Sequence, residues 1–380
     1  MTQVRRTVFA FYYLDKDRLA DGVALLRGED LRSRAQLVAL AILTGERHAL
    51  TRSEFDLLMS VPSDRWVKAV ALDRDLVASL LEKGLLVSDS DDQHDKRLRG
   101  REESLSRNYW NLYAALYHYM TQWSGVQLDL GDADGTEAPT EPGSGREFLS
   151  RLGPPPSPFG ESRGGTALPL PDVERDGELF RTLLARRTVR SFDLNSSMTV
   201  EQLSTVLRYV FGYHGFADTV PEVVCVNRTS PSGGAMHPVE AYPIITDVAD
   251  IEPGIYHYDC RAHSIELIES LDQREGRRLA TSFMSGQSHL GAAHVSFVLT
   301  ARFERNHWKY RWHQRAYAAI LMDAAHLSQT LYLVSTELGL RAFVTVAING
   351  RDIEERLGLD GIGEGVIAVT GCGVGAEPPY

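Results

Sequence analysis

Four short segments in the second half of the chain carry side chains that could bind or transform a ligand. The first, Arg186-Arg187-Thr188-Val189-Arg190, gathers three guanidinium groups and one hydroxyl within five residues. The planar fork of arginine suits bidentate contacts to phosphate. The alternative is the solvated basic end of a helix, where cations meet the negative end of the helix dipole.

The second segment runs from Ser230 to Pro238 and contains Ser230, Pro231, Ser232, Gly233 and Gly234. Small residues let the main chain approach a flat ligand closely. Serine and glycine are also common in ordinary loops, and a single histidine such as His237 is more often structural than catalytic.

The third segment places Lys309 and Tyr310 among aromatic residues, directly before a long helical pattern. Burial against apolar rings lowers the pKa of a lysine toward neutrality, which makes it a usable base. The alternative is an exposed lysine beside a tyrosine at an interface.

The fourth segment, residues 366–375, is a predicted strand followed by a glycine-rich turn. It lacks the spacing and the following helix of a dinucleotide-binding loop, which excludes a Rossmann site. Cys225, Cys260 and Cys372 lie too far apart to suggest a disulfide framework or a cysteine zinc site. We therefore expect no bound metal and a reducing, cytoplasmic compartment.

The composition of the chain limits the class of protein to which these segments can belong. A chain of 380 residues with 43% hydrophobic and 24% charged side chains is typical of a globular protein of two to three units. The net charge of −11 disfavours binding to nucleic acid or to anionic lipid. No uncharged apolar run approaches the ~20 residues of a membrane span, so we expect a soluble protein.

Residues 1–95 predict a small module. A strand is expected over 7–14, and the spacing of Leu31, Ala35, Val38 and Ile42 predicts a helix. A second helix follows the capping box of Thr51 and Glu54, and a third begins near Asp73 and ends at Gly84, before a short strand over 85–87. This order of elements indicates a winged-helix-like module. It carries 13 basic and 16 acidic residues, a net charge of −3, so we expect peptide docking or a structural role rather than DNA binding.

Residues 96–171 predict a connection between two architectures. The segment 89–103 is densely charged and is expected to be a solvated connector, and a helix rich in aromatic residues follows over 109–123. Glycine, proline and acidic residues dominate from 125 to 171, which predicts a linker.

Residues 172–380 predict an α+β domain. Its first helix is expected to be capped by Asp176, with Leu179, Leu183 and Leu184 facing inward. A second helix follows the capping box of Thr199 and Gln202, and a long one runs from Ala316 to Leu338 and ends at Gly339. The predicted strands are 242–247, 254–258, 265–268, 295–301 and 366–371.

In this order, the segments resemble the nitroreductase-like flavoproteins, and more closely the SagB-type dehydrogenases, which oxidise thiazolines and oxazolines during the maturation of ribosomal peptides. The resemblance covers about residues 175–375. The stretch 186–190 matches the flavin-phosphate motif Arg-Arg-Ser-x-Arg, with threonine in place of serine, and 230–238 matches Pro-Ser-x-Gly-x-x-x-Pro. Gly339-Leu340 matches the Gly-Leu pair that closes the long helix, and Lys309-Tyr310 matches the pair used for proton abstraction.

The resemblance implies a nitroreductase-like fold that binds FMN as cofactor, with a central, mostly antiparallel sheet. It implies cofactor contacts from residues Arg186, Arg187, Thr188, Arg190, Ser230, Pro231, Ser232, Gly233, Gly339 and Leu340. Lys309 or Tyr310 would take a proton while a hydride passes to flavin N5. It further implies a precursor peptide as substrate, a peptide-clamp role for the first module, a cyclodehydratase complex as partner, and a homodimer.

Two alternatives remain open. One is a reductase on the same fold that acts on dehydroamino acids or on nitro or quinone compounds. The other is a non-catalytic peptide-binding protein.

Overall fold

A computed structural model describes residues 2–16, 35–128, 157–159, 164, 168–217 and 223–376. Most of the predicted linker 125–171 therefore lies outside the described residues, as does Leu31 of the first predicted helix. None of the helices in the described ranges is both long and apolar enough to cross a membrane.

The largest element is a six-stranded sheet in the order β11-β10-β9-β12-β14-β13, and each neighbouring pair is antiparallel. Its strands are β9 (Val239–Ile245), β10 (Gly254–Asp259), β11 (Ser264–Ser270), β12 (Val295–Arg302), β13 (Leu340–Thr345) and β14 (Glu364–Val374). The five predicted strands are all present. The α+β prediction is therefore confirmed, and β13 is an additional strand at the edge of the sheet.

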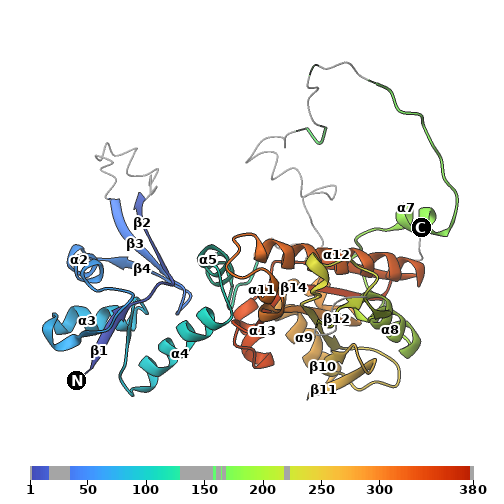
Figure 1. The fold of residues 1–380 in the computed structure, drawn as a ribbon. Helices are drawn as coiled ribbons and strands as arrows, with labels where there is room; N and C mark the ends of the chain where they lie inside the picture. Colours follow the sequence, from blue (N-terminus) through green and yellow to red (C-terminus); the bar gives the residue numbers. More distant parts are fainter. Residues whose placement is uncertain are drawn as a thin grey trace, which may run out of the picture.

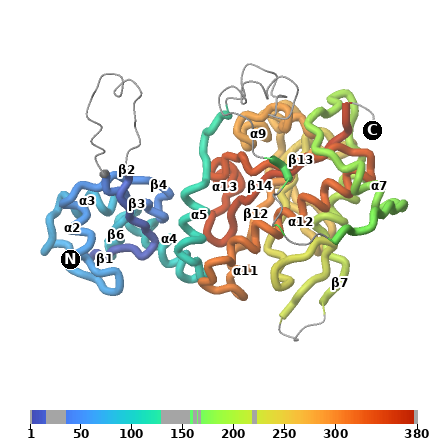
Figure 2. Tube along the Cα trace, turned by 90° about the horizontal axis from the view of Figure 1, so that it is seen from above, coloured from blue at the N-terminus to red at the C-terminus, as the bar shows by residue number. Residues whose placement is uncertain are grey.

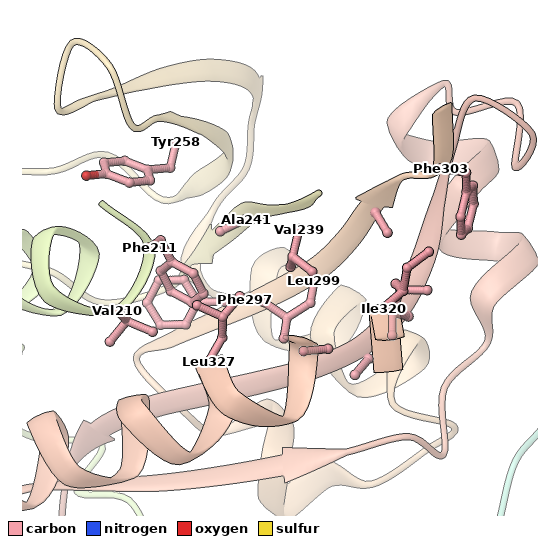
Figure 3. Close-up of a cluster of buried hydrophobic side chains, with 14 of the residues drawn as sticks. Val210, Phe211, Val239, Ala241, Tyr258, Phe297, Leu299, Phe303, Ile320 and Leu327 are labelled. Carbon is pink, nitrogen blue, oxygen red and sulfur yellow. The ribbon is translucent and has the colours of Figure 1, made fainter. Parts of the chain in front are cut away.

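Helices cover both faces of this sheet because alternate side chains of a strand point to opposite faces. On β12, Phe297 and Leu299 pack with Ile320 and Leu327 of the long helix on one face, whereas Val298 packs into a second core on the other (Figure 3). The first face is covered by α12 (Ala316–Glu337) and α8 (Val200–Val206), and the second by α9 (Gln273–Phe283) and α13 (Gly350–Leu357). Thr199 and Gln202 form the predicted capping box of α8.

Helix α7 (Glu178–Ala185) lies beside α12 at the edge of the molecule (Figure 1). The prediction that its leucines face inward is wrong: Leu179 is 62% exposed and Leu184 is 74% exposed. The predicted cap is also wrong. Gly177 is the N-cap residue, and the Asp176 carboxylate accepts hydrogen bonds from Gly177 N and from Arg181 instead of capping the first turn.

The described part of residues 1–95 contains two three-stranded sheets, β5-β1-β6 and β2-β3-β4, with α2 (Arg52–Ser60) and α3 (Arg74–Glu82). The strands are β1 (Gln3–Arg6), β2 (Ala10–Lys16), β3 (Ala35–Ala41), β4 (Glu46–Leu50), β5 (Val67–Lys68) and β6 (Leu86–Ser88). The helix predicted through Ala35, Val38 and Ile42 is wrong. Residues 35–41 form the central strand of a sheet, where pairing on both sides outweighs a short apolar pattern that also fits a helix.

The prediction of a solvated connector over 89–103 is also wrong, because most of this segment forms α4 (Gln93–Arg107). Leu98, Glu102 and Leu105 are buried at helical spacing within the charged sequence, and Glu102 pairs with Arg5. The predicted aromatic helix is α5 (Leu112–Thr121), and it joins the module to the sheet (Figure 2).

Candidate active site

Helix α12 presents two sets of residues that point in nearly opposite directions. The first set approaches the segment Ser230–Gly233 and consists of Ala319, Asp323, His326 and Thr330. The second set lines a cavity and consists of Tyr317, Leu321, Ala324, Ala325 and Ser328. The first set follows steps of four, three and four residues. Apart from Ala325, the second set repeats these steps two residues earlier, which is a rotation of about 200°.

On the first face of α12, a turn is built around Asp323. Ser232 Oγ donates to Asp323 Oδ2 over 2.5 Å, and Gly233 N donates to Asp323 Oδ1 over 3.1 Å. The buried Ser230 Oγ lies 2.6 Å from Thr330 Oγ1. Burial raises the pKa of Asp323, although hydrogen bonds from the turn act against the shift. Asp323 lies outside the four sequence segments, although an acidic residue within an apolar helical pattern is a signal that could have pointed to it.

Lys309 and Tyr310, at the end of α11 (Phe303–Lys309), lie directly over this turn. Lys309 Nζ donates to the carbonyl of Gly234 over 3.2 Å. Gly234 has a φ of 61°, and a Cβ atom there would come within 2.5 Å of Lys309 Nζ and 2.7 Å of Tyr310 Oη. The positive φ therefore favours glycine, and a side chain here would have to displace the ends of Lys309 and Tyr310. Lys309 is exposed in this chain, so the apolar surroundings considered for its use as a base are not supplied by the chain alone.

The turn has one further tie to α12, because Pro231 O lies 3.2 Å from Nδ1 of His326. The structure thus brings together the second and third sequence segments, with Ser230, Pro231, Ser232 and Gly233 held against α12 and the Lys309-Tyr310 pair above them.

The arginine-rich segment lies elsewhere on α12, at Tyr332. The guanidinium of Arg186 stacks over the Tyr332 ring at 5.5 Å, and Thr188 Oγ1 lies 3.1 Å from Tyr332 Oη. Arg187 differs, because its Nη1 donates to the carbonyls of Leu184 and Arg186, at 2.7 and 2.8 Å. Arg187 therefore stabilises the end of α7, which is the alternative considered for this segment.

A cavity of about 720 Å³ lies on the second face of α12. Its remaining walls come from α5, from the residues after β13 and from β14, and they include Tyr117, Trp123, Val344, Val346, Ile348 and Ile367. Ser328 lines the cavity, and Tyr332 follows Ser328 by one helical turn on the same face. Arg186 and Thr188 contact Tyr332 and so lie about one helical turn beyond Ser328, and the exposed Arg190 follows them in the chain.

The donor set on the second face of α12 fits a flavin mononucleotide. The walls are largely apolar, as a flat ring system requires, and the polar residues Thr121, Gln122 and Ser328 also line the cavity. Guanidinium groups and a threonine hydroxyl about one helical turn beyond Ser328 suit a phosphate. Among the described residues, no cluster of His, Cys, Asp and Glu is suited to a metal ion.

The two remaining motifs are Gly339-Leu340 and the glycine pattern near Cys372, and both lie in or beside strands of the main sheet. Gly339 has a φ of 71° and follows the end of α12, and the buried Leu340 begins β13. The glycine pattern near Cys372 lies within β14, which extends to Val374, and a Cβ on Gly371 would come within 2.5 Å of Phe343. These glycines allow close packing in the sheet and form no phosphate-binding loop.

The fold and these sites can be compared with known proteins. Residues 183–374 match the nitroreductase family. The chain is also 31% identical over 191 residues to a protein of Methanocaldococcus jannaschii that is named a nitroreductase, and the alignment covers 50% of this chain and 87% of that protein. The chain therefore belongs to the nitroreductase family.

Two further proteins are similar to parts of the chain. The trifolitoxin-processing protein TfxB of Rhizobium leguminosarum bv. trifolii is 32% identical over 136 residues, which are 36% of this chain and 36% of TfxB. The chain thus spans about a third of that relative. A structure of the Escherichia coli microcin synthetase McbBCD complex with truncated pro-MccB17 bound has the same fold, with a TM-score of 0.50, 19% identity, and coverage of 72% of this chain and 97% of the matched chain.

Proposed function

We propose that the protein is an FMN-dependent oxidoreductase that oxidises thiazoline or oxazoline rings in a ribosomally made peptide. Family membership indicates an oxidoreductase. The observation that carries the finer proposal is the position of Lys309 and Tyr310, which lie against the Ser-Gly-Gly turn, where Lys309 Nζ donates to the carbonyl of Gly234. Similarity to a trifolitoxin-processing protein supports a peptide as substrate.

The cofactor would be held by residues on the second face of α12. Arg186, Thr188 and Arg190 would bind the phosphate, and the apolar cavity beside Ser328 would hold the ring system. When bound, FMN supplies a two-electron acceptor, whereas the protein supplies binding, orientation and a base.

The chain's own chemical contribution is removal of a proton. Oxidation of an azoline takes a proton from one ring carbon and a hydride from the neighbouring atom, which leaves an aromatic ring. Lys309 Nζ or Tyr310 Oη would accept the proton, with the carbonyl of Gly234 orienting the lysine through its hydrogen bond. General-base assistance of this kind contributes typically ~10²–10⁴-fold to a rate.

The two halves of the site would come from two copies of the chain. The cavity and the Lys309-Tyr310 turn occupy opposite faces of α12, so one copy cannot direct both at the same ring. The solvent side of α12 and α7 exposes apolar residues that a second copy would cover, including Leu183, Leu184, Leu321 and Met322. This supports a homodimer in which each active site contains residues from both subunits.

The first module would bind the precursor peptide. Its net charge of −3 disfavours nucleic acid, and α4 and α5 join it directly to the wall of the cavity. The likeness of fold to a protein in a synthetase complex with a bound propeptide is consistent with a cyclodehydratase partner.

The proposal is tested by mass spectrometry of a thiazoline-containing peptide incubated with the FMN-loaded protein. We expect a loss of two mass units for each ring, and we expect Lys309→Ala to reduce the rate by ~10²–10⁴-fold. Arg261→Ala, at an exposed position between β10 and β11 and outside the first module, is the control and should retain the native rate. A gain of two mass units would assign a reductase instead.

A further inference from the structure

A buried histidine on α5, outside the proposed catalytic pair, lies between two cavities. His118 is 0% exposed and packs against the rings of Trp110, Phe303 and Tyr317. Its Nδ1 lies 2.9 Å from Tyr317 Oη. Among the described residues, its Nε2 has no hydrogen-bonding partner within 3.5 Å and lies 3.9 Å from Oε1 of Glu354, so an approach of roughly 1 Å would form a hydrogen bond.

The two outer members of this row each reach a different cavity. Tyr317 lines the 720 Å³ cavity proposed for the flavin. Glu354 lines a second cavity of about 670 Å³, which lies between the first module and the sheet domain. Much of its wall is formed by Thr44, Gly45, His94, Arg97, Arg101, Arg351, Glu355 and Asp360. His118 therefore lies between a redox cavity and a polar cleft.

The local packing brings Glu354 and His118 together. Val366 N donates to Glu354 Oε1 over 3.0 Å, which fixes the carboxyl group. Gly365 leaves the space between the two groups open, because a Cβ there would come within 2.8 Å of Glu354 Oε1 and 3.2 Å of His118 Nε2. The φ of Gly365 lies outside the left-handed region, so the glycine is required by space rather than by conformation.

We propose that Tyr317, His118 and Glu354 form a proton relay that connects the flavin cavity with the polar cleft. A proton that arrives at Tyr317 Oη displaces the hydroxyl proton to His118 Nδ1, and the proton on His118 Nε2 passes to Glu354 Oε1. One proton enters, one leaves, and no net charge stays on the imidazole. The proton that reaches Tyr317 Oη would be the one that Lys309 or Tyr310 of the second copy removes from a substrate in the cavity, and this source rests on the proposed function.

The surroundings favour this assignment. Burial lowers the pKa of His118 to about 3, so the ring is neutral near pH 7 and can donate from one nitrogen while it accepts at the other. Burial raises the pKa of Glu354 to about 7, so this carboxyl group can take up and release a proton near neutrality. The other titratable or charged groups that act on the pair are Arg101, Tyr117, His307, Arg351 and Asp360.

The relay is tested by ¹⁵N NMR of histidine-labelled full-length protein without flavin, with His118 assigned from a His118→Gln variant. We expect His118 to remain neutral from pH 5 to pH 9 and its ring shifts to follow one titration centred near 7, which belongs to Glu354. Glu354→Gln should abolish this titration, and Tyr317→Phe should move the Nδ1 resonance. Glu355→Gln, on the wall of the same cleft, is the matched control and should change neither.

Two NMR results would overturn the relay: His118 shifts that still titrate in Glu354→Gln, or a His118 ring that itself becomes protonated between pH 5 and pH 9. A second measurement compares flavin reduction with proton release, followed by an indicator dye, in one anaerobic turnover of the FMN-loaded protein. Glu354→Gln and Tyr317→Phe should slow proton release by roughly 10²-fold, whereas release at the native rate would contradict the proposal. A wild-type protein that fails to oxidise any azoline would refute the proposed function, and the NMR titration would still decide the relay.

Discussion

At the scale of single residues, the role of each side chain in the candidate site follows from the contacts that it already makes. Asp323 uses both carboxylate oxygens to hold the Ser-Gly-Gly turn, so it positions the turn rather than meeting a substrate. Two arginines, Arg186 and Arg187, also differ in the contacts that they make. Arg186 faces Tyr332, whereas Arg187 is occupied by main-chain carbonyls of its own helix.

This division predicts different effects on flavin binding. Arg186→Ala should weaken the affinity for FMN by roughly 10- to 100-fold, because a hydrogen bond to a charged group contributes about 1.5–3 kcal/mol. Arg187→Ala is the matched control and should bind FMN almost as tightly as the native protein. Fluorescence titration of FMN measures both affinities, and equal losses in the two variants would contradict the assignment.

At the scale of elements, the first module is held together by a carboxylate between two helices. Burial acts to raise the pKa of Glu54, but hydrogen bonds from Lys83, Ser79 and Thr51 outweigh it and lower the pKa to about 2. A pKa below that of the unfolded chain means that these contacts stabilise the fold above about pH 4.5. Their contribution is lost as the pH falls from 4.5 toward 2.

Glu54→Gln keeps the side chain that completes the capping box and removes the charge. We expect it to lower the free energy of unfolding at pH 7 by about 1–3 kcal/mol, and to lower it less as the pH falls below 4.5. Glu82→Gln, at an exposed position on α3, is the control. Urea unfolding across this pH range measures the effect, and a loss that is independent of pH would count against the role of the charge.

The elements also show what sequence patterns can predict. Five of the six strands of the main sheet, the capping boxes at Thr51 and Thr199, and the end of α12 at Gly339 follow from local chemistry, whereas β13 was not predicted. Residues 35–41 were misassigned because a short apolar run fits a helix and a strand equally well, and pairing between distant segments decides the outcome. The charged sequence of α4 conceals a buried stripe whose one acidic member, Glu102, pairs with Arg5.

The residues of the site could be selected from the sequence, but their arrangement in space could not. Lys309 and Tyr310 could be selected from the sequence as the third segment, but their approach to Gly234 depends on the packing of α11 beside α12. The exposed leucines of α7 were expected to face a core, since periodicity reports that a face is apolar and does not identify what covers it.

At the scale of the whole molecule, one hydrophobic core extends from the first module into the sheet domain. A single core cluster contains Phe9 and Val87 of the module together with Trp110 and residues of β12 and α12. Arg351 donates to the carbonyl of Gly45 across the polar cleft. The cleft that Glu354 lines is therefore part of the fold, and a peptide bound to the module would lie close to it.

In the proposed homodimer, each active site takes its cavity from one copy of the chain and its Lys309-Tyr310 turn from the other. The decisive measurement pairs Arg186→Ala with Lys309→Ala chains that carry different affinity tags and purifies the mixed dimer. In a twofold dimer the mixed pair retains one intact site. At an FMN concentration that fills the native site and leaves the Arg186→Ala site largely empty, turnover of a thiazoline-containing peptide should recover to about half of the native rate, while each parent dimer turns over far more slowly. A mixed dimer as inactive as its parents would show that both halves of the site belong to one chain and would contradict the claim.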